Sequence, residues 1–136
     1  MNRVFLGGTC NNSKWRSLVK KALEIGYFDP VVEDWTEECK EEELKQREEC
    51  DYCLYVITPR MKGVYSIAEA VDDSNKRPEK TLFCILRFDE EFCFDKQEYN
   101  SLKEVRNLVE RNGAKVFKNL SEVVTFLNTK SDIGGK

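Results

Sequence analysis

Residues 52–57 read YCLYVI and residues 81–86 read TLFCIL. Both segments are apolar nearly throughout, without the alternation of apolar and polar side chains found in a strand with one face in solvent. Continuous hydrophobicity is typical of strands covered on both faces, as in a parallel sheet between two layers of helices. The two segments therefore predict inner strands of an α/β domain.

Strands and helices alternate on either side of these two segments. The further strands are expected at residues 4–6, 28–32 and 114–117, and the helices at residues 13–25, 36–50, 66–74, 101–112 and 121–128. This alternation predicts one α/β domain over residues 1–129, a flavodoxin-like five-stranded parallel sheet of order 2-1-3-4-5 with helices on both faces. Residues 130–136 are expected to be a disordered tail.

The composition is that of a solvated globular protein. The 136 residues include 22 basic and 25 acidic side chains, a net charge of −3, whereas nucleic-acid and anionic-membrane surfaces need clustered lysine and arginine. No apolar run approaches the roughly 20 residues that span a bilayer. We therefore expect neither a nucleic-acid polymer nor a membrane as a partner.

Histidine is absent, and six cysteines are present. Without histidine the commonest metal ligand is missing, and the pair Asp72-Asp73 has no evident third ligand, so no metal and no cofactor are expected. The Cys50-x-x-Cys53 spacing lies at the entry of a buried strand, which favours burial over redox chemistry. No signal peptide is apparent, and reduced cysteines fit a cytoplasmic protein.

The expected strand order places a crevice at the carboxyl ends of the first and third strands, where ligands bind in folds of this kind. The first loop at this crevice is residues 7–13, GGTCNNS. Gly7 and Gly8 let a ligand approach the backbone, and Thr9 and Asn11 add side-chain donors. An ordinary strand-to-helix turn capped by a serine explains the same residues equally well.

The second loop is residues 58–65, TPRMKGVY, and it leads into Ser66 and Glu69. The spacing of these two residues alone favours a capping box, in which the glutamate bonds back to the start of its helix. The position at the crevice favours chemistry, because a carboxylate in the first helical turn is kept ionised by backbone donors and the helix dipole. An ionised carboxylate can attack an anomeric carbon and form a covalent glycosyl intermediate.

Glu43 stands out in a strongly acidic predicted helix. It shares one helical stripe with Cys39 and Cys50, so it would be half-buried near the Glu69 helix if that stripe faces the sheet. A half-buried glutamate there would be suited to donate a proton. The alternative is an ordinary ion pair with Arg47, four residues later.

Four segments fall in order on matching elements: FLGGT at residues 5–9, PVVEDW at 30–35, residues 50–59 from CDY to TP, and GVYSIAE at 63–69. Together they resemble the nucleoside 2-deoxyribosyltransferase-like proteins, over about residues 3–86 and more loosely to the end. The resemblance implies a flavodoxin-like fold and cleavage of an N-glycosidic bond in a small-molecule nucleoside or nucleotide. It also implies a homodimer or larger homo-oligomer, because members are commonly oligomers with sites near the interface.

The resemblance also implies roles for single residues. Glu69 matches the nucleophile that attacks C1′ of the sugar, and Glu43 matches an acid on the preceding helix that helps the base depart. Neighbouring residues of the two loops, and of the helix that follows the first loop, complete the set expected at the substrate. The set is Gly7, Gly8, Thr9, Asn11, Arg16, Gly63, Tyr65 and Ser66. Gly63 stands where the classical transferases have an aspartate, and Glu43 stands where the acid of the preceding helix is usually an aspartate. The sequence therefore does not determine which base and which sugar the substrate contains.

The acceptor and the phosphate state also stay open. A second base as acceptor makes the protein a transferase, and water makes it a hydrolase. Arg16 or Lys62 could hold a 5′-phosphate together with amides and hydroxyls of the loops. Two other functions fit the sequence. The protein could bind a nucleotide without catalysis, or it could be an NAD glycohydrolase of the TIR type.

The segment at residues 88–99 is acidic and rich in aromatic side chains. Its aromatics are Phe88, Phe92, Phe94 and Tyr99. We expect this segment to close over the site, to pack in a subunit contact or to form a local apolar cluster.

Overall fold

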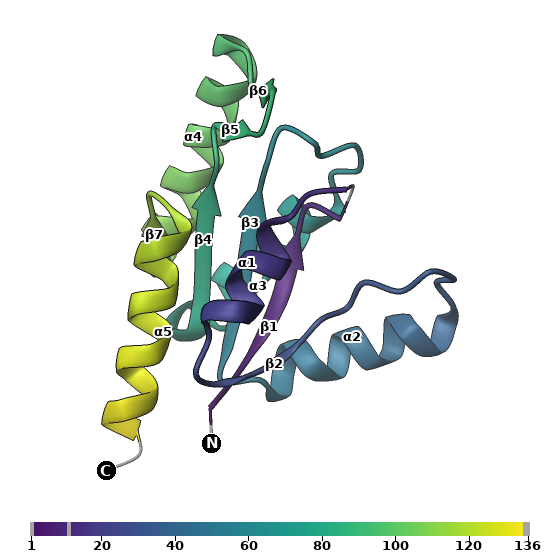
Figure 1. Ribbon diagram of the computed structural model, residues 1–136, viewed down its shortest axis with the longest axis vertical. Coiled ribbons are helices and arrows are strands. Elements are labelled where there is room, and N and C mark those ends of the chain that lie inside the picture. Colours follow the sequence, from purple (N-terminus) through teal and green to yellow (C-terminus); the bar gives the residue numbers. More distant parts are fainter. Residues whose placement is uncertain (1, 11, 135–136) are drawn as a thin grey trace.

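The computed structural model describes residues 2–10 and 12–134 (Figure 1). A five-stranded parallel sheet has the order β2-β1-β3-β4-β7. Its strands are β1 (Arg3–Gly8), β2 (Gly26–Phe28), β3 (Tyr52–Ile57), β4 (Thr81–Ile85) and β7 (Lys115–Phe117). Because β7 is the fifth parallel strand along the chain, this is the flavodoxin-like order that the sequence predicted.

Helices lie on both sides of the sheet. In the described residues they are α1 (Trp15–Ala22), α2 (Glu37–Glu49), α3 (Tyr65–Lys76), α4 (Lys96–Arg111) and α5 (Leu120–Gly134), with the short 3₁₀ helix η1 (Pro78–Lys80) before β4. The apolar residues of α1 and α5 pack on one face, and those of α3 and α4 on the other. Figure 1 shows α2 projecting away from the sheet beside the segment that follows β2.

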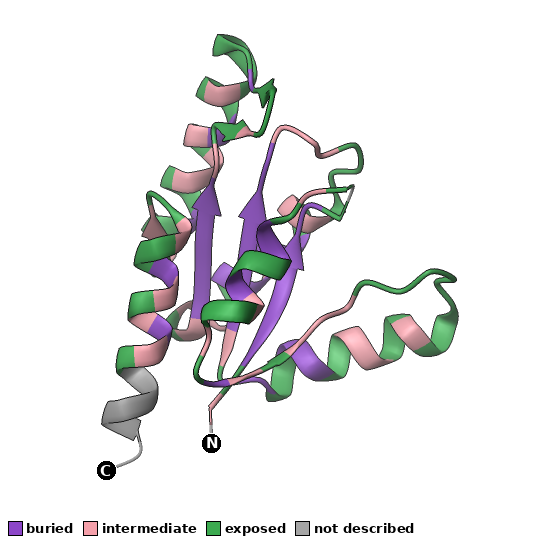
Figure 2. Ribbon diagram, viewed as in Figure 1, coloured by how far each residue is buried: buried purple, intermediate pink, exposed green. Residues whose placement is uncertain are grey.

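The inner strands contribute to two separate cores, one on each face of the sheet. Tyr55 and Phe83 belong to the cluster under α3 and α4, whereas Leu54 and Val56 belong to the cluster under α1 and α5. Cys53 to Ile57 are all fully buried, as Figure 2 shows for the inner strands. Burial on alternating sides explains why the YCLYVI segment is apolar at successive positions.

Two segments differ from the expected elements. The edge strand β2 spans Gly26–Phe28 and not residues 28–32, because Pro30 lacks the N–H that a ladder needs. Within residues 88–99, β5 (Phe88–Asp89) and β6 (Phe92–Cys93) form an antiparallel hairpin. Asp95 and Glu98 then form a capping box that starts α4 at Lys96, five residues earlier than expected.

The aromatics of this segment divide into two pairs. Phe94 is buried in the core and Tyr99 packs against it, whereas Phe88 and Phe92 are exposed. Phe94 and Tyr99 are thus part of the core under α3 and α4 and not of a separate local cluster, whereas the hairpin carries Phe88 and Phe92 at the surface.

The last helix is longer than predicted. α5 continues to Gly134, beyond the expected end at residue 128. The predicted disordered tail overlaps this helix at residues 130–134, and residues 135 and 136 lie outside the described part. None of the helices in the described residues, α5 included, is long and apolar enough to cross a membrane.

All six cysteines have free thiols. Cys50 and Cys53 are both buried, and the Cys53 thiol donates to the Arg47 carbonyl over 3.3 Å. Burial raises the pKa of Cys53 to about 12, so this thiol is inert at neutral pH. The spacing of the two cysteines thus reflects packing at the start of β3.

Candidate active site

A cavity of about 550 Å³ opens at the carboxyl ends of β1 and β3, where the strand order predicted a crevice. Its buried lining residues are Gly8, Thr9, Arg47 and Glu69. Its exposed lining includes Val31, Val32, Trp35, Leu44 and Tyr65, which we call the apolar mouth. A buried charged centre surrounded by apolar and aromatic side chains is the usual composition of a small-molecule site.

The glycines at the cavity differ in what fixes them. Gly8 has a φ of +116°, and a Cβ there would meet the Val56 carbonyl oxygen at 2.1 Å. A Cβ at Gly7 would meet the Tyr55 ring at 2.6 Å, and Gly7 does not line the cavity. Gly63 lines the cavity, and no atom lies within 4 Å of a Cβ built there. The strand β3 therefore demands the first two glycines, whereas position 63 has room for a side chain.

Thr9 and Arg16 support the first loop from inside. The Thr9 hydroxyl accepts a hydrogen bond of 2.9 Å from the Thr58 amide, which ties the ends of β1 and β3 together. The Arg16 guanidinium donates to the carbonyls of Leu6, Gly8 and Thr9 and lies 3.5 Å from Asp29. Burial lowers the pKa of Arg16, against the opposing effect of Cys10 and Asp29.

This geometry makes Arg16 a support for the loop. The side chain is buried and does not line the cavity, so its donors serve carbonyls and not an open ligand position. Asn11, the other expected donor of this loop, lies outside the described residues.

Ser66 does not form the capping box that its spacing with Glu69 suggested. α3 begins at Tyr65 behind Val64, without a side-chain cap. The Ser66 hydroxyl instead donates over 3.0 Å to the Gly8 carbonyl, which joins α3 to the first loop. Glu69 is therefore not used as a cap, and it lies in the second turn of the helix at the cavity.

The Glu69 side chain is 10% exposed and faces Arg47, with 3.7 Å between its Oε2 and the guanidinium Nη1. Burial raises the pKa of Glu69 to about 7, reinforced by Glu43 and Asp73 and opposed by Arg47 and Arg16. The sequence predicted a carboxylate held ionised by the helix start, and this was wrong. Desolvation dominates, so the carboxyl is divided between its two protonation states near neutral pH.

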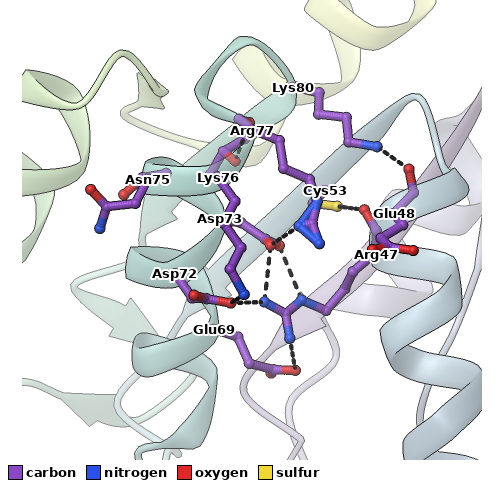
Figure 3. Close-up of polar contacts among 12 residues, drawn as sticks. Arg47, Glu48, Cys53, Glu69, Asp72, Asp73, Asn75, Lys76, Arg77 and Lys80 are labelled. Carbon is purple, nitrogen blue, oxygen red and sulfur yellow. Dashed lines mark hydrogen bonds and ion pairs between the residues drawn. The ribbon is translucent and has the colours of Figure 1, made fainter.

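Arg47 is the centre of a buried polar network that the sequence did not reveal (Figure 3). Its Nε and Nη2 contact the two oxygens of Asp73 at 3.2 and 2.9 Å, and Nη2 also lies 2.9 Å from Asp72. Tyr55 donates its hydroxyl to Asp73, which is fully buried. These anchors leave Nη1 directed at Glu69.

The charges of this network are fixed by its contacts. Burial alone would lower the pKa of Arg47, but the hydrogen bond to Asp73 and the surrounding acidic groups raise it above its usual range. Burial, together with the charge of Asp73, raises the pKa of Tyr55 well above its usual value. Arg47 is therefore a permanent cation beside Glu69. Asp72 and Asp73 are engaged with arginine, and the described residues contain no acidic, cysteine or histidine cluster that could hold a metal.

Glu43 lines the cavity and is partly buried. Its Oε2 accepts a hydrogen bond of 2.8 Å from the Trp35 indole. The expected alternative, an ion pair with Arg47, does not occur among the described contacts, because Arg47 turns towards α3. Trp35 is thus a further candidate residue, and Lys40, also on the cavity wall, is another that sequence reasoning missed.

The sheet order and the cavity together define a flavodoxin-like α/β domain with a carboxyl-bearing crevice between β1 and β3. The family model described as nucleoside 2-deoxyribosyltransferase like matches residues 1–87, and the chain belongs to this family. The resemblance drawn from the sequence is confirmed, and membership indicates an enzyme that acts on nucleosides. No curated protein matches the chain. The matched part contains every residue that lines the cavity, whereas the β5–β6 hairpin and all later elements lie beyond it.

Proposed function

We propose that the protein cleaves or transfers the N-glycosidic bond of a nucleoside or nucleotide through a covalent glycosyl intermediate on Glu69. The observation that carries the proposal is a single buried carboxyl with a pKa of about 7 in the cavity, beside the permanent cation Arg47. A carboxyl in this setting is ionised often enough to attack, and it is poorly solvated and therefore reactive.

In the first step an oxygen of Glu69 attacks C1′ of the sugar. The C1′–N bond breaks, its electron pair remains with the base, and a Glu69–C1′ ester forms. The leaving base nitrogen takes a proton from Glu43, or from a water that Glu43 holds. Arg47 stabilises the ionised Glu69 before the attack without the tight bidentate contact that would block its oxygens, since only Nη1 faces it, at 3.7 Å.

In the second step an acceptor replaces Glu69 at C1′. Glu43, now a carboxylate, takes a proton from the acceptor, whose lone pair attacks C1′ and releases Glu69. A second base as acceptor gives transfer, and water gives hydrolysis. Two displacements retain the configuration at C1′.

The phosphate state of the substrate depends on the cations that reach the cavity. Arg16 is occupied by carbonyls of the first loop, which weakens the case for a 5′-phosphate at that residue. Lys40 lines the cavity and is a candidate for that contact. Lys62 of the second loop is the other candidate, although it is not part of the cavity lining. The proposed substrate class is therefore a nucleoside or its 5′-monophosphate.

The apolar mouth supports the proposal of a homodimer or larger assembly. Trp35 and Tyr65 are 56% and 67% exposed, and a second copy could cover them and narrow the entrance. Light scattering at working concentrations tests this, and a monomer would remove the proposal of an assembly.

A metabolite panel tests the function itself. The wild type and Glu69→Gln are each incubated with nucleosides, 2′-deoxynucleoside 5′-monophosphates and NAD, with and without a second free base as acceptor, and freed bases and exchanged products are identified by mass spectrometry. We expect a base from a nucleoside or nucleotide with the wild type alone. Release from NAD only would favour an NAD glycohydrolase. Binding without release from any compound would identify a nucleotide-binding protein, and both outcomes would reject the proposal.

A further inference from the structure

The β5–β6 hairpin is too short to hold its own shape. Each strand has two residues, and Glu90 in the turn has a φ of +56°. An isolated two-stranded hairpin is marginal in water at best, and a non-glycine residue at positive φ adds strain. The conformation therefore depends on side-chain contacts with the rest of the protein.

Those contacts converge on Asp89. Its Oδ2 accepts a hydrogen bond of 2.6 Å from the Ser13 hydroxyl, in the loop between β1 and α1. Its Oδ1 lies 3.4 Å from Nε of Arg60, in the loop between β3 and α3. The Asp89 side chain is only 9% exposed, so both interactions are shielded from solvent. One carboxylate thus bridges the two loops that line the cavity.

The remaining contacts of the hairpin strengthen the same bridge. Glu90 bonds Nη2 of Arg60 at 3.0 Å and lies 3.6 Å from the ammonium of Lys14. The Arg60 guanidinium also stacks over the Phe92 ring, 4.4 Å from its centroid. Oppositely charged side chains of the hairpin and of the two loops therefore pair with one another.

The two loops are also joined at the cavity. Thr9 accepts from the Thr58 amide, and Ser66 donates to the Gly8 carbonyl. Gly8, Thr9 and Ser66 line the cavity, whereas Ser13, Arg60 and the hairpin residues are not part of its lining. The loops are thus held from two sides, and only the outer side depends on residues beyond the segment matched by the family.

We propose that Asp89 is a positioning residue that holds the Ser13 and Arg60 loops in the arrangement needed to bind substrate. The inference rests on the proposed function for its consequence in catalysis, but not for its structural part. Without Asp89 the two loops lose their buried anchor on the hairpin and keep the more exposed contacts of Glu90 with Arg60 and Lys14, while Glu69 and Arg47 keep their own buried network.

Hydrogen exchange of the full-length protein tests the structural part without any substrate. In Asp89→Ala we expect amide exchange to accelerate about tenfold in residues 9–14 and 58–64, the equivalent of one charge-assisted hydrogen bond. The matched control is Glu91→Gln, because this exposed carboxylate contacts the same Arg60 at 3.6 Å but has no hydrogen bond or ion pair with a described residue of the first loop. Faster exchange confined to residues 88–93, or equal acceleration in the control, would overturn the proposal.

Kinetics test the consequence for the site. Asp89→Ala should raise KM about tenfold and change kcat far less. The acidic limb of the pH profile should stay where it is, since Glu69 is untouched. A large fall in kcat with an unchanged KM would overturn the positioning role.

The two parts fail separately. An inactive wild type would reject the proposed function, while loosening of both loops in Asp89→Ala would still support the bridge. If Asp89→Ala does not fold, Ser13→Ala removes the first-loop half of the bridge, together with the long 3.5 Å contact that the Ser13 hydroxyl accepts from the Trp15 amide. It should loosen residues 9–14, and unchanged exchange there would overturn the proposal.

Discussion

The two walls of the cavity differ in how firmly they are held. On the wall formed by α3 and the first loop, Gly8, Thr9 and Glu69 are buried. Thr9 bonds the Thr58 amide at the end of β3, and Glu69 faces Arg47, which is itself held by other contacts. On the wall formed by α2 and the segment before it, Trp35 and Leu44 are about half exposed. The proposed nucleophile Glu69 lies where the core makes it rigid, whereas the proposed acid Glu43 lies on the α2 wall. The exposed side chains of that wall can rearrange and are suited to choose the substrate.

The largest expected effect is on the rigid wall. Glu69→Gln should reduce kcat by at least about a thousandfold, because an amide is a far weaker nucleophile than a carboxylate of the same shape. Base release followed by chromatography measures this, with circular dichroism as a check that the fold is kept. A variant that retains most of the wild-type activity would remove Glu69 as the nucleophile.

Arg47→Ala should destabilise the protein by about 3–5 kcal/mol, because it leaves the fully buried Asp73 without its main cation. Urea unfolding measures the change. Lys45→Ala is the control, since this exposed lysine on the same helix should change the free energy of unfolding by less than about 0.5 kcal/mol. Equal effects of the two substitutions would show that the network does not join α2 to α3.

The pKa of Glu69, about 7 in the folded protein, predicts two pH dependences. Activity should fall as pH drops through 7, because the attacking carboxylate becomes protonated. Stability should behave in the opposite way: the raised pKa favours folding below the unfolded pKa of about 4.5, and this contribution is lost as pH rises through 7. Glu69→Gln should therefore be more stable than the wild type at pH 8, by up to about 3 kcal/mol, and similar at pH 4.5.

Unfolding curves of both proteins from pH 4.5 to 8 measure this difference. A constant offset between them across that range would contradict a raised pKa. The stability difference should grow between pH 4.5 and 7 and level off above pH 7, near the midpoint of the kinetic limb, because the same group causes both.

Gly63→Asp tests substrate choice at the point where the cavity has free space. No atom obstructs a side chain there, so the variant should fold normally. The added carboxylate should shift the ratio of specificity constants about tenfold towards a free nucleoside and away from its 5′-monophosphate, a difference of about 1.4 kcal/mol. Gly63→Asn separates charge from size. An unchanged ratio in both variants would place residue 63 away from the sugar.

The smallest effect belongs to the exposed wall. Trp35→Phe keeps an aromatic ring but removes the hydrogen bond to Glu43. We expect kcat/KM to fall about fivefold, the value of one modest hydrogen bond. In a Glu43→Gln background the same substitution should cost less, and equal costs in both backgrounds would show that the tryptophan does not act through Glu43.

The sequence predicted features that depend on continuous local patterns. The apolar runs gave the inner strands, because residues buried on both faces need no alternation, and the strand order then located the crevice. The sequence failed where tertiary contacts override local spacing. Ser66 and Glu69 had the spacing of a capping box, yet Ser66 bonds to Gly8 in another loop.

Tertiary contacts also explain why the roles of two arginines were predicted wrongly. Arg47 stood four residues after Glu43 and suggested a local pair, but its guanidinium bonds Asp72 and Asp73 on α3. Arg16 suggested a phosphate contact, but the loop carbonyls surround it. The Asp89 hairpin was invisible because two-residue strands leave no periodic signal.

Gly8 and Gly63 are constrained in opposite ways, and this difference determines which substitutions the cavity can accept. Every side chain at position 8 collides with the backbone of β3, so single substitutions there are lost with the fold. Position 63 faces the same cavity with no steric barrier, and it can sample acids, amides and apolar groups without first requiring a compensating change. New substrate preferences in this scaffold are therefore most accessible through the second loop, while the first loop stays an invariant frame.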